Sequence, residues 1–317
     1  MAAHEHHHHA HGHEHSHGLS HGHAHAPASY GRAFAIGIAL NIGFVVVEAG
    51  FGLYANSMAL LADAGHNLSD VLGLVLAWGA AALSKWQPTR RFTYGLRSSS
   101  ILAALANALL LFVAIGGIVW EAILRFKSPE PVAAGIVMAV AAIGVVINTA
   151  TALLFMRGQK HDLNIRGAFL HMAADAAISL GVVIAGLALM WTGWLWLDPL
   201  VSLAISAVIV VATWALLRES VDLALHAVPR NIDSEGVRRY IAALPGVESL
   251  HDLHIWPLST TETALTCHLV MPAGHPGDAF LDRAAHELGR AHGISHATFQ
   301  IELGNGPRCA LEPDTVV

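Results

Sequence analysis

The chain has 317 residues, of which 54% are hydrophobic and only 13% are charged, and its mean hydropathy is +0.52. This is the composition of a membrane protein. The formal net charge of -6 is small and no basic stripe accompanies it, so nucleic acid is not an expected partner. The two cysteines, Cys267 and Cys309, are too few for a disulfide framework and form no CxxC motif.

The N-terminal segment is a His-rich, low-complexity tract. Residues 1–27 hold twelve of the 23 histidines and contain no long apolar run, so they resemble neither a signal peptide nor a transit peptide. Such a tract cannot form a core, but its many imidazoles can hold metal loosely. We predict a disordered tail at residues 1–29 that acts as a weak zinc buffer or delivery arm. The alternative is a dispensable solvated tail.

Between residues 30 and 220, apolar stretches recur at about the 20 residues that a helix needs to cross a bilayer. Six are predicted, at residues 33–54, 58–83, 99–124, 132–156, 168–191 and 195–217. Lys and Arg gather in the second-to-third and fourth-to-fifth loops, whereas the first-to-second and fifth-to-sixth connections have none. Basic short loops face the cytoplasm. We therefore predict a multi-pass protein of the cell inner membrane, with six transmembrane helices and both termini cytoplasmic.

Residues 221–304 have lower hydropathy and predict a small cytoplasmic α+β domain. The expected elements are a helix at 233–244, strands at 247–256 and 263–271, a helix at 276–291 and a strand at 298–303. This αββαβ order suggests an open ferredoxin-like sheet. Residues 305–317 are predicted to be a disordered tail.

Two HxxxD motifs carry the chemistry that is expected at membrane depth. His66 and Asp70 lie one turn apart on one face of the second predicted helix, and His171 and Asp175 do so on the fifth. Buried ionisable groups are costly in a membrane and should face the bundle interior. Two facing motifs would supply two imidazoles and two carboxylates, a closed tetrahedral set for Zn2+. The alternative is a pair of interhelical hydrogen bonds that only holds the bundle together.

Three further acidic residues lie in the predicted helices. Glu48 and Asp63 would either relay protons and guide the ion or serve as satisfied interhelical partners. Asp198 precedes Pro199, a pair typical of a helix start.

Four segments of the chain resemble the cation diffusion facilitators, a family of metal/proton antiporters. They are LADAGHNLSD, FTYGLRSSSILAALANALLL, AFLHMAADAAISLGV and SLHDLHIWPL. The resemblance is closest to the zinc-exporting branch of bacterial antiporters, and it implies that His66, Asp70, His171 and Asp175 form the transport site. It also implies a homodimer with paired cytoplasmic domains, and alternating access.

The resemblance further implies a metal site in the cytoplasmic domain. In similar proteins the histidine of the HDL motif, a histidine on the next strand and an acidic residue on the last strand bind metal, which matches His251, His268 and Glu302. His296 is a plausible fourth ligand. Strand alternation predicts that His251 and His254 point to opposite faces of the sheet. Some relatives carry another site in the second-to-third loop, but here that loop has no His, Asp, Glu or Cys, so none is predicted.

The expected function is proton-coupled efflux of Zn2+ by alternating access. Zn2+ is expected both as the transported ion and as a regulatory ligand, and H+ is the expected counter-ion. Metal and protons compete for the same ligands. The sequence lacks the phosphate-binding motif GxxxxGK[ST], which counts against an ATP-driven pump. Two alternatives remain, an exporter mainly of Cd2+ or Co2+ and a membrane-anchored metal sensor. An enzyme is not expected because the ligand set leaves no open coordination position. Expected partners are divalent metal ions, membrane lipid and a second copy of the chain.

Overall fold

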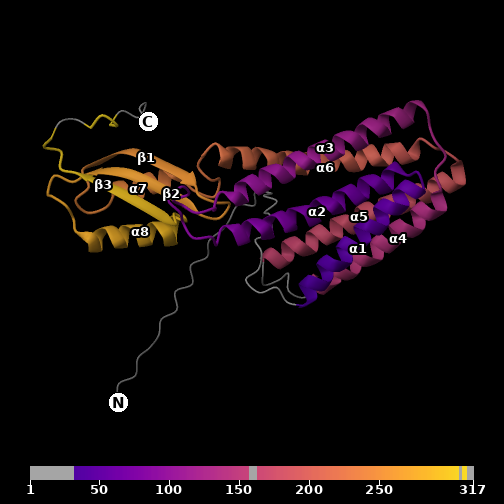
Figure 1. The fold of residues 1–317 in the computed structure, drawn as a ribbon, viewed down its shortest axis with the longest axis horizontal. Helices are drawn as coiled ribbons and strands as arrows, with labels where there is room; N and C mark the ends of the chain where they lie inside the picture. Colours follow the sequence, from indigo (N-terminus) through magenta and orange to yellow (C-terminus); the bar gives the residue numbers. More distant parts are fainter. Residues whose placement is uncertain (1–31, 157–162, 307–308, 313–317) are drawn as a thin grey trace, which may run out of the picture.

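A helical bundle and a small sheet domain make up the molecule (Figure 1). The structure is a computed structural model that describes residues 32–156, 163–306 and 309–312. The predictions for the His-rich tail at residues 1–29 fall outside the described residues. The bundle lies at one end of the long axis and the sheet domain at the other.

Six helices form the bundle, and they follow the six predicted apolar stretches. They are α1 (Arg32–Tyr54), α2 (Met58–Leu83), α3 (Ser99–Lys127), α4 (Ala134–Met156), α5 (Leu163–Thr192) and α6 (Leu197–Ala224). Four segments within the described residues are long and apolar enough to cross a membrane: Ser99–Lys127, Ala134–Leu153, Phe169–Thr192 and Leu197–Ala224. The structure therefore supports a membrane bundle, and a count of six spans remains a prediction.

Close helix packing in the bundle depends on small residues, as is usual between membrane helices. A Cβ atom on Gly144 of α4 would lie 2.7 Å from Phe44 Cζ of α1 and 3.1 Å from Ser179 Oγ of α5. A Cβ atom on Gly186 of α5 would lie 2.8 Å from Met138 Cγ of α4. Larger residues at these positions would push the helices apart. The apolar core of the bundle is built from all six helices and includes Phe44, Leu60, Leu111, Val140, Val182 and Ile205.

Asp198 joins α6 to the start of α2 at the end of the bundle that is distant from the sheet domain. We call this end of the bundle the far end. Asp198 lies in the first turn of α6, in agreement with the predicted helix start. Its carboxylate also caps α2: it accepts hydrogen bonds from Ser57 Oγ, from the Met58 N–H at 2.6 Å and from the Ala59 N–H at 3.3 Å. These N–H groups have no partner within their own helix. The carboxylate therefore fixes α2, the helix of the first HxxxD motif, to α6.

The sheet domain has the predicted αββαβ order. Its elements are α7 (Ser234–Ala242), β1 (Ser249–Pro257), β2 (Thr263–Val270), α8 (Asp278–His292) and β3 (His296–Glu302). The strand order is β1-β2-β3, with β1 antiparallel and β3 parallel to β2. Asp233 caps α7 by accepting from the Gly236 N–H at 3.0 Å. Gly293, at φ 72°, ends α8 in the left-handed conformation.

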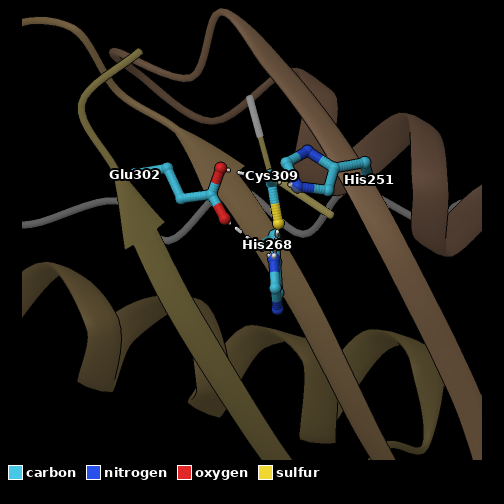
Figure 2. A group of neighbouring side chains, drawn as sticks. All are labelled: His251, His268, Glu302 and Cys309. Carbon is cyan, nitrogen blue, oxygen red and sulfur yellow. Dashed lines mark hydrogen bonds and ion pairs between the residues drawn. The ribbon is translucent and has the colours of Figure 1, made fainter. Parts of the chain in front are cut away.

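Alternation in the strands gives the sheet two different faces. Leu265, Cys267 and Leu269 of β2 point into a core that also holds Val237 and Ile241 of α7 and Leu288 of α8. The intervening residues of β2, among them Thr266 and His268, point to the opposite face. Helices α7 and α8 cover the apolar face, and among the described residues no helix covers the histidine-bearing face of the sheet (Figure 2).

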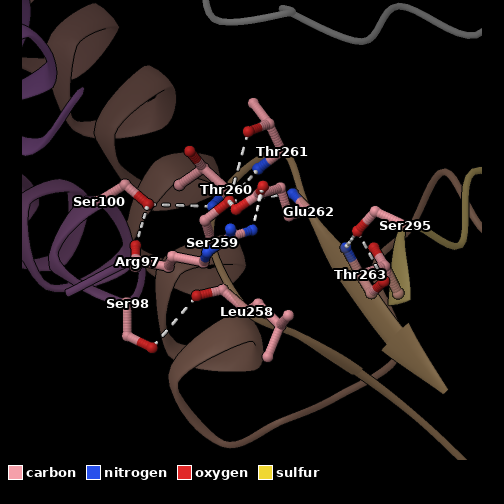
Figure 3. Close-up of polar contacts among 10 residues, drawn as sticks. All are labelled: Arg97, Ser98, Ser100, Leu258, Ser259, Thr260, Thr261, Glu262, Thr263 and Ser295. Atoms are coloured by element: carbon pink, nitrogen blue, oxygen red, sulfur yellow. Dashed lines mark hydrogen bonds and ion pairs between the residues drawn. The ribbon is translucent and has the colours of Figure 1, made fainter. Parts of the chain in front are cut away.

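The chain just before and at the start of α3 touches the hairpin between β1 and β2 (Figure 3). Three polar contacts join them: the Arg97–Glu262 ion pair, a hydrogen bond from Ser98 Oγ to the Leu258 carbonyl at 3.2 Å and one from the Thr260 N–H to Ser100 Oγ at 3.1 Å. The ring of Tyr94 also lies edge-on to that of His296, with centroids 5.8 Å apart. We call these contacts the interdomain clamp. The clamp connects the bundle directly to the strands that carry His251 and His268.

Candidate metal sites

The two HxxxD motifs face one another between α2 and α5, and they pair crosswise. His66 Nε2 lies 3.1 Å from Asp175 Oδ1, and His171 Nε2 lies 3.1 Å from Asp70 Oδ2. His171 Nε2 is also 3.7 Å from Asp175 Oδ2. Ligand atoms of His66, Asp70 and Asp175 all lie within 4.8 Å of one another. We call these four residues the intramembrane cluster.

The exposed fraction of the side chains in the intramembrane cluster decreases along the bundle axis, from the side of the sheet domain toward the far end. The side chains of His171 and Asp70 are 41% and 26% exposed, those of His66 and Asp175 15% and 1%. Asp70 and His171 lie one turn nearer the sheet domain than His66 and Asp175, because α2 runs toward that domain and α5 runs away from it (Figure 1). The cluster is therefore more open on the side of the sheet domain and closed toward the far end.

A second cluster lies on the helix-free face of the sheet (Figure 2). His268 Nδ1 is 2.9 Å from Glu302 Oε1, and His251 Nε2 is 3.5 Å from Glu302 Oε2. Cys309 Sγ lies 3.7 Å from His268 Nδ1. Ligand atoms of all four residues lie within 4.8 Å of one another. We call this group the sheet cluster.

Strand pairing explains the position of each residue of the sheet cluster. His251 is paired directly with His268 across β1 and β2, and Val270 is paired with Glu302 across β2 and β3. Because directly paired residues share a face, and Val270 shares a face with His268, all three ligands project from the same side. His251 and His268 are buried, at 7% and 8% exposure, although both are polar. His251 Nε2 has no hydrogen-bond partner among the described residues, which suits a group held ready for a metal ion.

A β-bulge corrects the expectation that His251 and His254 point to opposite faces. The register moves from His251 opposite His268 to His254 opposite Thr266, so β1 contains one extra residue. Asp252 at the bulge has a φ of 51°. His254 therefore returns to the face that carries His251. Asp252 bridges His254 and His268, with Oδ1 2.8 Å from His254 Nε2 and Oδ2 3.4 Å from His268 Nε2.

His296 does not join the sheet cluster. It begins β3 and is paired with Ala264, at the opposite end of the strand from Glu302. Its ring contacts Tyr94 in the interdomain clamp. Cys309 takes the fourth position. Sequence reasoning missed it because Cys309 follows the last strand in a segment expected to be disordered, and no spacing motif marks it.

Cys267 is buried, whereas Cys309 is half-buried beside Glu302. Burial raises the pKa of the Cys267 thiol to about 12, which keeps it protonated and inert at neutral pH. Burial also acts to raise the pKa of Glu302, but hydrogen bonds with Cys309, Gln300 and His268 and the charge of His251 outweigh it, so the pKa of Glu302 is lowered. Glu302 is thus a carboxylate, the form that binds metal.

Comparisons with known proteins agree with both parts of the chain. The family model described as the cation efflux transmembrane domain matches residues 34–223, and that of the cation efflux protein cytoplasmic domain matches residues 229–303. The chain belongs to the cation efflux family. This is the cation diffusion facilitator family that its motifs resemble, and its members are metal cation transporters and antiporters, not enzymes.

Several relatives are similar over nearly their whole length. The zinc transporter ZitB of Escherichia coli is 38% identical over 284 residues, which is 88% of this chain and 90% of that protein. The metal cation efflux system protein CzcD of Cupriavidus metallidurans is 36% identical over 273 residues, 86% of each chain. The cadmium, cobalt and zinc/H(+)-K(+) antiporter of Bacillus subtilis is 34% identical over 276 residues, 86% of this chain and 88% of that one.

Among the solved structures that are similar to part of this chain is an isolated domain of a relative. It is the metal-bound C-terminal domain of the CzcD transporter, from an organism printed as Cuprividus metallidurans. It is 40% identical and covers 23% of this chain and 100% of that chain, with a TM-score of 0.20.

Proposed function

We propose that the protein exports Zn2+ from the cytoplasm in exchange for protons, by alternating access through the intramembrane cluster. The observation that carries this proposal is the crosswise pairing of two HxxxD motifs between α2 and α5. Zinc prefers four nitrogen, oxygen or sulfur ligands in a tetrahedron, with bonds of about 2.0 Å that place the ligand atoms about 3.3 Å apart. The His66–Asp175 and His171–Asp70 separations of 3.1 Å are close to that value.

Proton exchange follows from the same four residues. Each imidazole lies against a carboxylate, so protons and a metal ion compete for one set of lone pairs. A metal ion that enters from the open side must displace protons, and protons that arrive from the other side must displace the metal. No separate energy-coupling domain is needed for such an exchange.

The remaining architecture of the proposal follows the sequence predictions. We propose six transmembrane helices in the inner membrane within residues 30–220, both termini in the cytoplasm, and tails at 1–29 and 305–317. Residues 221–304 would form a ferredoxin-like cytoplasmic domain through which two copies pair. The family model that matches this domain is named for a dimer, which supports the homodimer.

We further propose that the sheet cluster holds a regulatory zinc ion through His251, His268, Glu302 and Cys309. Two imidazoles, a carboxylate and a thiolate are a complete set of ligands that zinc accepts. The burial of both histidines supports this assignment. His251 Nε2 supports it too, because it makes no hydrogen bond among the described residues and lies 3.5 Å from Glu302 Oε2. The relative CzcD has a C-terminal domain that was solved with metal bound.

Two alternatives to zinc export are separable by experiment. Nitrogen and carboxylate ligands do not exclude Cd2+ or Co2+ by affinity alone, and the Bacillus subtilis relative is named for cadmium, cobalt and zinc. A membrane-anchored sensor would bind metal in the sheet cluster without any flux. The buried carboxylate of Asp175 argues against the sensor, because an anchor gains nothing from an ionisable group at that depth.

The test is metal flux into sealed vesicles of purified protein, with a zinc dye and a pH dye inside. We expect zinc entry to require an acidic lumen and to be accompanied by proton exit. Asp175→Asn should reduce zinc flux at least a hundredfold (about 2.7 kcal/mol) because it removes a charged ligand, whereas the exposed control Asp282→Asn should match the unmodified protein. Zinc flux that ignores the pH gradient, or that survives in Asp175→Asn, would refute the proposal.

A further inference from the structure

Two carboxylates outside the metal ligands are fully buried in the bundle. Glu48 of α1 and Asp63 of α2 are both 0% exposed. Glu48 faces the side of α2 that carries Asp63, because its hydrogen-bond partner Asn67 lies one helical turn after Asp63. Glu48 Oε2 accepts a hydrogen bond from Asn67 Nδ2 at 3.1 Å, and Asp63 Oδ2 accepts one from Ser179 Oγ at 3.0 Å. Each carboxylate thus has one oxygen satisfied by a neutral donor.

The remaining oxygens of the pair have no donor. Glu48 Oε1 and Asp63 Oδ1 are buried and without a hydrogen-bond partner among the described residues. Within the same part of the chain, no Lys or Arg forms an ion pair with either group. Two negative charges on facing sides of α1 and α2, away from water and without a cation, are far less stable than one carboxylate and one carboxylic acid. A single proton between the two groups removes one charge and satisfies both orphaned oxygens.

The pair lies one helical turn beyond the intramembrane cluster, toward the far end. Asp63 precedes His66 by one turn of α2, and its hydrogen-bond partner Ser179 follows Asp175 by one turn of α5. His66 and Asp175 are the titratable groups of α2 and α5 that act electrostatically on Asp63. α1 contributes Glu48 itself, and α4 carries no charged residue. The charge on the pair and the charge in the cluster are therefore coupled through a low-dielectric interior.

We propose that Glu48 and Asp63 form a second proton-binding site, distinct from the metal ligands, that holds one shared proton in the metal-free protein and releases it when a metal ion occupies the intramembrane cluster. This inference rests on the proposed function, in which that cluster binds the transported ion. The arriving divalent charge favours the doubly ionised pair, and departure of the metal restores the proton. The pair adds one proton to the exchange beyond those carried by the metal ligands.

Two readouts test the pair in the full-length protein in lipid nanodiscs. The first is the infrared C=O band of a protonated carboxylic acid, which should be present without metal and lost on adding zinc. The second is the number of protons released on zinc binding, measured by calorimetry in buffers of different ionisation enthalpy. Glu48→Gln and Asp63→Asn should each remove the band and lower the release by about one proton per intramembrane zinc. Glu121→Gln, at a half-exposed position on α3, is the matched control and should change neither.

The outcomes separate this inference from the proposed function. If the carboxylic-acid band and the proton release are unchanged in both Glu48→Gln and Asp63→Asn, the second site is overturned. Two variants are used so that the test still stands if one of them misfolds. A wild-type protein that shows no band and releases K+ or Na+ on binding zinc would overturn it too, because the pair then holds a monovalent cation. Asp175→Asn addresses the cluster alone: if it leaves zinc binding unchanged, the proposed transport site fails, while the metal-free band still reports the shared proton.

Discussion

The interdomain clamp should transmit zinc binding in the sheet cluster to the bundle, and its energy can be worked from its contacts. The Arg97 and Glu262 side chains are 40% and 34% exposed, so solvent screening limits their ion pair to at most about 1 kcal/mol. The two hydrogen bonds of the clamp add about 0.5–1.5 kcal/mol each. The sum of about 2 kcal/mol falls within the usual range of 1–3 kcal/mol for coupling between sites.

The assay is a double-mutant cycle on zinc-dependent activation of flux. Arg97→Ala and Glu262→Ala should each reduce activation by about two- to fivefold, and the double variant should lose little more than either single one. The exchanged pair, Arg97→Glu with Glu262→Arg, should recover part of the loss. High salt should mimic the single variants because the pair is partly exposed.

Arg290→Ala is the matched control, since Arg290 pairs with Glu287 on the surface of α8 and takes no part in the clamp. Its activation should equal that of the unmodified protein. Additive losses in Arg97→Ala and Glu262→Ala, or activation that is unchanged in both, would show that the clamp does not couple the two sites.

The structure leads to four further predictions. Zinc should protect Cys309 from alkylation, as measured by mass spectrometry, whereas Cys267 should stay unlabelled with or without zinc; equal labelling of Cys309 in both conditions would remove it from the sheet cluster. Because burial raises the pKa of Cys267 from its ordinary 9.0 to about 12, the stability that it contributes is complete below pH 9 and is lost as the pH rises toward 12. Denaturant unfolding should show this loss in the unmodified protein and not in Cys267→Ala. Asp198→Ala should lower the free energy of unfolding by about 2–4 kcal/mol, because it leaves two N–H groups at the start of α2 unpaired, and an unchanged melting temperature in detergent would contradict this capping role. His66→Asp should retain zinc transport and admit Cd2+, since a larger ion accepts an oxygen-richer shell; an unchanged ratio of Cd2+ to Zn2+ flux would show that His66 does not set selectivity.

The meeting of the two HxxxD motifs between α2 and α5 could be expected from the sequence, because helical periodicity is regular. A spacing of four residues places His66 with Asp70, and His171 with Asp175, on one face each, and the cost of burying charge turns both faces inward. What periodicity does not give is which histidine meets which carboxylate. The crosswise pairing depends on the offset between α2 and α5, which tertiary packing decides.

The sheet cluster shows where local patterns fail. Strand alternation predicted that His251 and His254 lie on opposite faces of the sheet. One extra residue at Asp252 changes the register, and the sequence of β1 does not indicate this bulge. His296 was expected as a plausible fourth ligand, yet it begins β3, and the length of the strand separates it from Glu302. Cys309 joins the cluster through a contact with His268, 41 residues away in sequence, which no local pattern predicts. The capping of α2 by Asp198 is likewise a contact between segments far apart in sequence.

The most direct test of the account is the coordination of zinc within the membrane. X-ray absorption would be recorded on protein that lacks residues 1–27 and carries His268→Ala and Cys309→Ser, so that neither the tail nor the sheet cluster contributes bound metal. We expect one zinc ion per chain with two imidazole nitrogens and two oxygens at about 2.0 Å, and no sulfur. The same protein with Asp175→Asn should lose this ion. A shell with fewer than two imidazoles, or an unaltered spectrum in Asp175→Asn, would contradict transport through His66, Asp70, His171 and Asp175.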